Sequence, residues 1–369
     1  MGINHGYDVC DFFLTNSELR NNSTNPKLKC NIYIDGYVLW RSGTIPGTDL
    51  IDENIVEGNI EGIRQYIMST GNFDVQSTFI YFDGQPPKLK RSDNLGFIYP
   101  DSQLGRWIEK VRGSGYPGEI VLLEKGEAEI QCFLQRDRSI ASIICTSDSD
   151  ALHICYNDNS QRRSDRVFFY RLNYQHRECE KLYDTNLFTT KFNKNAFTLL
   201  LYLLGDKNYI KSLFTPSMVK KIFELLNEPT YADIFNRINT TMNELKLNID
   251  NIEKCIAFFI RLLCDARKNK ISQGKKRDTV SWPQSNTIMS TGNYIHVLRW
   301  MIMYSSMGSN VEYYDNFELI EPVGVEEITN LKYIYRLCVR VFPLDDNVIQ
   351  DFKKEIEHHM NNVAIDRLN

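Results

Sequence analysis

The sequence of 369 residues lacks the features of membrane-spanning, disulfide-bonded and zinc-binding proteins. It has no run of ~18 apolar residues, and its first residues, MGINHGYDVC, lack the basic-then-apolar order of a secretion signal. The nine cysteines are scattered and form no C-x2-C pair, and the six histidines are dispersed. We therefore expect a soluble, intracellular protein with buried thiols and no membrane partner.

The overall charge excludes little. The formal net charge is −4, the pI is about 5.9, and 42% of the residues are hydrophobic, which is enough for a sizeable core. A net acidic chain is not typical of a general polyanion binder. Acids clustered in a metal site, however, would offset basic residues elsewhere, so the net charge alone does not reveal a basic surface. Nucleic acid therefore stays open as a partner.

Strand and helix patterns alternate in the first part of the sequence. Short apolar runs predict strands at 30–34, 77–82, 140–145, 151–155 and 167–172. Helical spacing of apolar residues predicts helices at 51–69 and 104–111, and another that starts near Glu127. This alternation predicts an α/β fold with a mainly parallel sheet and helices on its faces.

Only helical patterns follow residue 192. They lie at 195–204, 217–226, 231–245, 249–266, 294–304 and 346–362. We place a soft boundary near residue 208, which gives a catalytic α/β domain at 1–208 and a mainly helical region at 209–369. Gly274, Pro283 and Gly292 indicate a long irregular connector at 268–292.

Six carboxylates follow predicted strands or begin a predicted helix. They are Asp35, Asp83, Glu127, Glu129, Asp148 and Asp150. Because the carboxyl ends of parallel strands meet at one crevice, we expect all six at one site. Crowded carboxylates repel one another unless cations lie between them, and an oxygen-only set favours Mg2+ or Mn2+ over zinc. Two such ions about 3.5–4 Å apart would support phosphodiester hydrolysis.

A different interpretation exists for each acid taken alone. An isolated aspartate after a strand is commonly a turn former or a helix cap. The repetition of acids at successive strand ends favours the metal site.

Five segments resemble the flap endonuclease/XPG group of 5′ nucleases, which is related to the XRN exoribonucleases and has a PIN-like, Rossmann-like catalytic domain. The segments are the initial MGI, IYIDG with Asp35, YFDGQPPKLK with Asp83, GEAEIQC with Glu127 and Glu129, and TSDSD with Asp148 and Asp150. The resemblance covers residues 1 to about 208. It implies Mg2+-dependent, structure-selective cleavage of 5′-flap or branched DNA with two ions, for which Mn2+ can substitute.

The resemblance also implies roles for single residues. Asp206, in LYLLGDKNYI, stands one residue early for a seventh metal ligand. Lys90 matches a lysine that contacts the scissile phosphate, with a solvated loop lysine as the alternative. Gly2 matches an N-terminal residue beside the active site. Trp40 lies near a base-stacking aromatic of the group, or packs in the core.

Several departures from the group bear on the substrate. Only 44 positions separate Asp83 from Glu127, so the usual basic arch is shortened, and the glycine-rich segment that grips duplex DNA does not follow Asp206. No sliding-clamp peptide is found. The remaining candidate nucleic-acid contacts are basic residues near the shortened arch and in a dense run between Arg267 and Arg277, which can equally be a solvated loop. They are Lys88, Arg91, Arg106, Arg112, Lys275, Lys276 and Arg277.

The sequence thus predicts a DNA-directed nuclease of replication or repair, as a divergent viral member of the group, in the nucleus or at a viral replication site. An RNA-directed nuclease of the XRN or virion host-shutoff kind is the alternative, because the arch and the duplex element are reduced. A catalytically silent PIN-like scaffold is a third, which the six intact acids disfavour.

Overall fold

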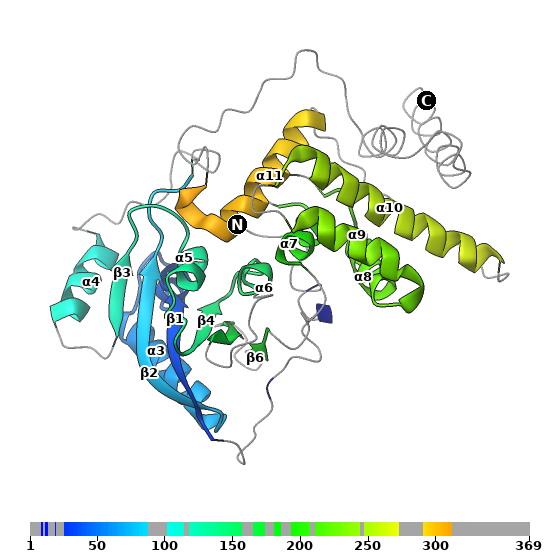
Figure 1. Cartoon of the computed structure of the whole chain (residues 1–369). Coiled ribbons are helices and arrows are strands. Elements are labelled where there is room, and N and C mark those ends of the chain that lie inside the picture. Colours follow the sequence, from blue (N-terminus) through cyan, green and yellow to red (C-terminus); the bar gives the residue numbers. More distant parts are fainter. Residues whose placement is uncertain are drawn as a thin grey trace. The chain divides into compact units, whose positions relative to one another are not determined.

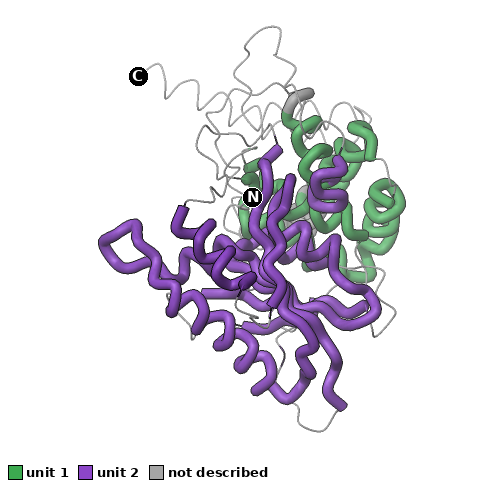
Figure 2. The backbone as a smooth tube through the Cα atoms, turned by 90° about the vertical axis from the view of Figure 1, so that its left-hand side faces the viewer, with its two compact units in different colours: residues 1–9, 192–302, 318–369 green, residues 10–191, 303–317 purple. Residues whose placement is uncertain are grey.

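The structure is a computed structural model. It describes residues 26–87, 102–113, 118–156, 165–173, 181–185, 193–206, 212–243, 247–272 and 291–311, with Val9, Phe12, Phe13, Leu19 and Ile210. The chain divides into two compact units (Figure 2). The helical unit comprises residues 1–9, 192–302 and 318–369, and the sheet unit comprises residues 10–191 and 303–317. The chain passes from the sheet unit to the helical unit at residue 192. The domain boundary near residue 208 stays a prediction.

The sheet unit is built on six strands in the order β3-β2-β1-β4-β5-β6 (Figure 1). The strands are β1 (Leu28–Asp35), β2 (Phe73–Phe82), β3 (Glu119–Leu122), β4 (Ala141–Thr146), β5 (Val167–Arg171) and β6 (Lys181–Asp184). All neighbouring pairs are parallel except β5 and β6, which are antiparallel. The predicted α/β fold with a mainly parallel sheet is confirmed.

Helices follow the strands and pack on the sheet. They are α2 (Gly36–Arg41), α3 (Glu53–Ser69), α4 (Gln103–Gly113), α5 (Ala128–Leu134) and α6 (Ala151–Ile154). Alternate residues of β1, which are Cys30, Ile32 and Ile34, belong to a buried core that also holds Ile60 of α3 and Trp107 of α4. Helix α5 packs instead across β1, β2 and β4.

The order of the strands reverses direction at β1. From β1 the chain runs outward to β2 and β3, and then returns through α5 to β4 on the other side of β1. In open α/β sheets, such a reversal leaves a ligand-binding crevice beyond the carboxyl ends of the central strands. Here those central strands are β1 and β4, which end at Asp35 and Thr146.

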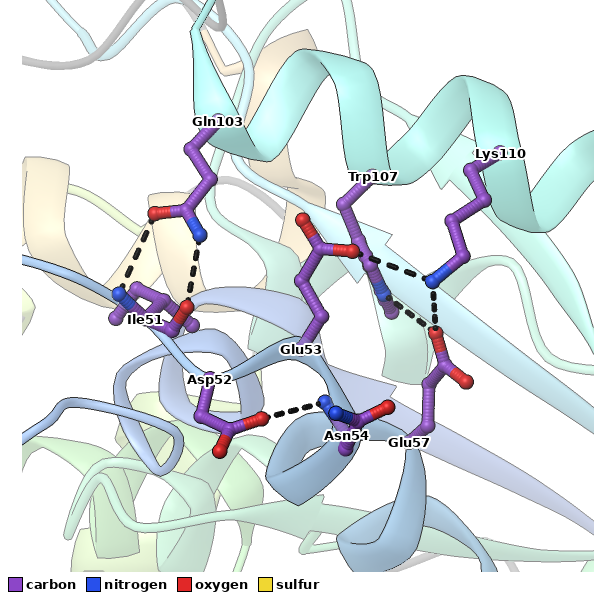
Figure 3. A network of polar contacts seen from close by, with 8 residues as sticks. All are labelled: Ile51, Asp52, Glu53, Asn54, Glu57, Gln103, Trp107 and Lys110. Carbon is purple, nitrogen blue, oxygen red and sulfur yellow. Dashed lines mark hydrogen bonds and ion pairs between the residues drawn. The ribbon is translucent and has the colours of Figure 1, made fainter.

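A polar network fixes α4 against the start of α3 (Figure 3). The side-chain amide of Gln103 donates to the Ile51 carbonyl oxygen over 2.7 Å and accepts from the Ile51 N–H over 3.3 Å. Further along α4, Lys110 lies 3.2 Å from Glu53 and 3.1 Å from Glu57, and the indole N–H of Trp107 donates to Glu57 over 3.3 Å. Helix α4 is therefore joined to α3 and to Ile51 by both neutral and charged contacts.

The described part of the helical unit contains α7 (Lys194–Tyr202), α8 (Pro216–Leu226), the 3-10 helix η4 (Pro229–Tyr231), α9 (Ala232–Met242), α10 (Ile249–Ser272) and most of α11 (Thr291–Met307). Thr215 caps α8 by accepting a hydrogen bond from the Met218 N–H over 3.3 Å, and Pro216 occupies the first turn, where its missing N–H costs nothing. Helix α10 packs against α8 and α9. Among the residues described in both units, no helix has the length and apolar character needed to cross a membrane.

Two sequence-based expectations differ from the structure. The strand predicted at 151–155 is wrong, because these residues form α6, where the Ile154 N–H donates to the Asp150 carbonyl oxygen over 3.1 Å. A short, fully buried apolar run has no periodicity that separates strand from helix. The irregular connector predicted from residue 268 begins too early, since α10 continues to Ser272. Residues 273–290 and the helix predicted at 346–362 lie outside the described part of the chain.

Candidate metal centre

Asp35 stands at the carboxyl end of β1 and is held by three hydrogen bonds. One carboxylate oxygen accepts from the backbone N–H groups of Tyr37 and Val38 over 3.1 and 3.2 Å, which caps α2. The other oxygen accepts from the Thr146 hydroxyl over 2.9 Å. Only 7% of the residue is exposed. Asp35 is thereby fixed at the point where β1, α2 and the end of β4 meet.

Asp83 follows β2 and reaches the start of α5. Its Oδ1 accepts a hydrogen bond from the Ala128 N–H over 2.7 Å. The neighbouring Gly84 donates to the Gly126 carbonyl oxygen over 2.9 Å, and a Cβ atom at Gly84 would lie 2.6 Å from the Leu123 carbonyl oxygen. The glycine after Asp83 is therefore needed for the close approach that brings the FDG and GEAE segments together.

Glu127 and Glu129 lie at the beginning of α5. Glu127 is the N-cap residue but makes no side-chain capping hydrogen bond, and Glu129 is in the first turn. They are 3% and 5% exposed. Acids are favoured here because the amino end of a helix carries partial positive charge.

Asp148 and Asp150 follow β4 in a tight turn before α6. The Asp148 N–H donates to the Thr146 hydroxyl oxygen over 3.1 Å, and the Asp150 N–H donates to the Asp148 carboxylate over 3.3 Å. Asp150 is completely buried at the N-cap position of α6 and makes no side-chain capping hydrogen bond. Thr146 thus connects Asp35 on one strand with Asp148 on the next.

The acids influence one another electrostatically. Burial first, then the charge of Glu129, then that of Asp83, raise the pKa of Asp35 well above its usual value, against the opposing hydrogen bonds from Val38 and Thr146. Burial, followed by the charges of Asp35 and Glu129, also raises the pKa of the Cys132 thiol. The charges of Glu129 and Asp83 therefore lie close enough to Asp35 to raise its pKa.

The chemistry of this group fits a hard divalent cation. Its donors are carboxylate oxygens alone, and the repulsion that raises the pKa of Asp35 would fall if positive charge lay between the acids. Across the described residues, no three His, Cys, Asp or Glu side chains are already arranged around a single point as ion ligands.

The capping interpretation accounts for only part of the group. Asp35 caps α2, and Asp83 accepts from the first residue of α5, so both have a structural role. Glu127 and Asp150 occupy N-cap positions without a side-chain capping bond. Helix capping therefore does not explain the presence of these two acids.

The other predicted ligand and catalytic residues fall elsewhere in the chain. Asp206 belongs to the helical unit, where it is buried and its N–H donates to the Ile210 carbonyl oxygen over 2.9 Å; it stays a predicted ligand. Seven predicted site residues lie outside the described residues. They are Gly2, Lys88, Lys90, Arg91, Lys275, Lys276 and Arg277.

Trp40 lies in the hydrophobic core. Its ring centroid is 5.4 Å from that of Trp107, and 9% of the residue is exposed. This packing favours the core alternative over base stacking.

The predicted cations of α4 face solvent. Arg106 and Arg112 are exposed, and Arg112 lies 3.4 Å from Glu109. Lys110, between them, is engaged by Glu53 and Glu57 (Figure 3). Arg106 and Arg112 stay predicted nucleic-acid contacts.

Thr146 is a site residue that sequence reasoning missed. It ends an apolar strand as the first polar residue of TSDSD and bonds to both Asp35 and Asp148. A hydroxyl residue directly before a pair of aspartates at a strand end is the signal that could have identified it.

Comparison of the sequence with protein-family models and with curated proteins finds no match. Solved structures with a similar arrangement include the catalytic core of Rad2 in complex with a DNA substrate, with a TM-score of 0.44 and 13% identity over 96% of this chain and 100% of that one. Human GEN1 in complex with Holliday junction DNA has a TM-score of 0.41 and 13% identity over 98% and 79% of the two chains. A bacteriophage T5 flap endonuclease complex with DNA and metal ions has a TM-score of 0.38 and 10% identity over 89% and 98%.

Proposed function

We propose that this protein is a metal-dependent nuclease that hydrolyses phosphodiester bonds in DNA at the carboxylate group formed by Asp35, Asp83, Glu127, Glu129, Asp148 and Asp150. The observation that carries the proposal is that two of these acids accept hydrogen bonds from other segments of the sheet unit. Asp35 binds the end of β4 through Thr146, and Asp83 binds the start of α5 through Ala128.

The electrostatics of the site indicate why a cation and a phosphate belong together there. Carboxylates alone would repel a phosphodiester, and divalent ions bound among them would reduce that repulsion and attract the phosphate. Mg2+ or Mn2+ held by these acids would supply a hydroxide nucleophile and charge to stabilise the leaving oxygen. The residues of the chain hold the donor oxygens in place: Thr146 and the α2 backbone fix Asp35, and Ala128 fixes Asp83.

The sequence motifs support the choice of substrate. YFDGQPPKLK and GEAEIQC resemble motifs of the flap endonuclease/XPG group, and that resemblance points to 5′-flap or branched DNA. Lys90, the last residue of PPKLK, is the proposed contact to the scissile phosphate. Asp206 is the proposed seventh ligand.

RNA is the second candidate substrate. It is favoured by the short interval between Asp83 and Glu127 and by the lack of a glycine-rich segment after Asp206, because both features serve branched duplex DNA in the group that the motifs resemble.

A substrate panel tests the proposal. Labelled 5′-flap, nicked, single-stranded DNA and RNA substrates are incubated with Mg2+ or with EDTA. We expect Mg2+-dependent cleavage of flap DNA, its loss in Asp148→Ala, and its retention in Asp74→Ala, which removes an exposed aspartate near the amino end of β2. Preferred cleavage of RNA would select the second candidate. Lack of cleavage of every substrate with both Mg2+ and Mn2+ would contradict both.

A further inference from the structure

A short segment from late in the sequence packs against the two helices that begin at the acidic residues. This return segment consists of residues 303–311, which include the end of α11 and the 3-10 helix η5 (Gly308–Asn310), and it belongs to the sheet unit (Figure 2). Helix α5, on which η5 packs, begins after Glu127 and carries Glu129. Helix α6 begins after Asp150.

The contact with α5 is made by Gly308. Its φ is 57°, and a Cβ atom there would lie 2.5 Å from Nε2 of Gln131 and 3.0 Å from Cδ1 of Leu134. Both residues belong to α5, and Gln131 is buried. The lack of a side chain at Gly308 is therefore what lets the return segment approach α5 so closely.

Gln131 connects this contact with the acidic end of the helix. Its backbone N–H donates to the Glu127 carbonyl oxygen over 3.1 Å. On its other side, a Cβ atom at Gly126 would lie 3.2 Å from Nε2 of Gln131 and 3.8 Å from Cβ of Ser309. The Gln131 side chain thus lies between the loop that precedes Glu127 and the return segment. A shift of this amide would therefore move the start of α5, where Glu127 lies.

The contact with α6 is made by Ser305. Its hydroxyl lies 3.4 Å from Nε2 of His153, and both residues are completely buried. His153 in turn donates its backbone N–H to the Asp150 carbonyl oxygen over 3.1 Å. Each contact of the return segment is therefore a few atoms from an acid of the candidate metal centre.

From these contacts we infer that Gly308 and Ser305 are positioning residues of the metal centre: the return segment holds α5 and α6 where Glu127, Glu129 and Asp150 can serve one divalent ion site. The inference rests on the proposed function, since it takes these acids to be ligands. A fragment that ends at residue 208 would therefore contain the six acids but lack the return segment that supports them.

The test compares Mn2+ binding by the full-length Gly308→Ala and Gly71→Ala variants in isothermal titration calorimetry. Gly71 is the matched control, because its φ is 74° and a Cβ atom there has nothing within 4 Å, so it imposes the same backbone strain without a clash. Removing a group that orients metal ligands commonly lowers affinity about 10–100-fold. We expect Gly308→Ala to weaken Mn2+ binding about tenfold or more and Gly71→Ala to leave it unchanged.

A second variant gives a readout that a purely structural role would not move. In Gly308→Ala combined with Gln131→Ala, the new Cβ atom no longer meets an amide, so Mn2+ affinity should rise again toward that of Gln131→Ala alone. Equal affinity of Gly308→Ala and Gly71→Ala, or no recovery in the double variant, would overturn the positioning role. If Gly308→Ala does not fold, Ser305→Ala is titrated instead. We expect it to bind Mn2+ severalfold more weakly than the wild type, and an unchanged affinity would contradict the inference.

The same titration separates the two proposals. Wild-type binding of Mn2+ with an unaffected Gly308→Ala variant would remove the positioning role and leave the metal centre standing. A wild-type protein that binds no Mn2+ would remove both.

Discussion

The hydroxyl of Thr146 donates to one carboxylate oxygen of Asp35 over 2.9 Å, and so connects the ends of two adjacent strands, β4 and β1. The same hydroxyl oxygen accepts from the Asp148 N–H over 3.1 Å. A single uncharged side chain therefore sets the relative positions of two predicted metal ligands from segments 111 residues apart in the sequence.

Replacement of Thr146 by valine tests this connection. Valine keeps the shape of threonine but leaves a buried carboxylate oxygen of Asp35 without its donor, which costs about 1–3 kcal/mol of the free energy of unfolding. We expect Thr146→Val to lose stability of that order in urea unfolding and to bind Mn2+ more weakly, while Thr146→Ser retains both. Equal stability and affinity of the valine and serine variants would show that the hydroxyl has no such role.

Removal of an acid should affect activity and stability in opposite directions. Asp148→Ala and Glu127→Ala should abolish cleavage, because each removes a proposed ion ligand. Their melting temperatures without metal should equal or exceed that of the wild type, since a repelling charge is lost. Thermal unfolding followed by circular dichroism in EDTA measures this. A large fall in melting temperature would indicate that these acids are structural.

The stability of the metal-free protein should depend on pH through Asp35. Burial and the charges of Glu129 and Asp83 raise its folded-state pKa well above the unfolded value of about 3.9. The folded state therefore binds the proton more tightly, and the stabilisation, complete below about pH 4, is lost as the pH rises through the raised pKa.

The Glu129→Gln variant isolates this effect. It removes one cause of the raised pKa of Asp35, so its free energy of unfolding should fall less than that of the wild type between pH 5 and pH 8 in EDTA. Glu109→Gln, which changes an acid whose side chain is 72% exposed on α4, should follow the wild type. Identical pH dependence in all three proteins would contradict the mutual repulsion of the acids.

A methyl group at Gly84 should disturb the joining of β2 and α5. The new Cβ atom would lie 2.6 Å from the Leu123 carbonyl oxygen, and backbone must move to relieve such a clash, at a cost of about 1–3 kcal/mol. Gly62→Ala, inside α3 with nothing within 4 Å of the new atom, should instead raise stability by about 0.5–1 kcal/mol. Urea unfolding compares them, and a Gly84→Ala variant as stable as the wild type would refute the close approach.

Much of the sheet unit could be predicted from the sequence because several of its strands are short apolar runs that lead to an acid. The run before Asp35 and the run before Asp83 both became neighbouring parallel strands. The short elements α2, β3 and β6, of four to six residues, were not predicted, since they hold too few residues for a periodic pattern.

The acids of the proposed site could be selected from the sequence, but the residues that support them could not. Thr146 bonds to an acid on another strand, and Ser305 contacts His153 across 152 positions of sequence. Such contacts depend on the packing of distant segments and leave no local pattern. Gly308 is a further example, because a side chain there would clash with Gln131 of α5.

The most direct test of the central claim is the position of bound Mn2+ in crystals of the wild-type protein, located by its anomalous scattering. The account predicts density between Asp35, Glu129 and Asp150, from one ion or from two about 3.5–4 Å apart. A structure at saturating Mn2+ with no anomalous density among these carboxylates would contradict the account.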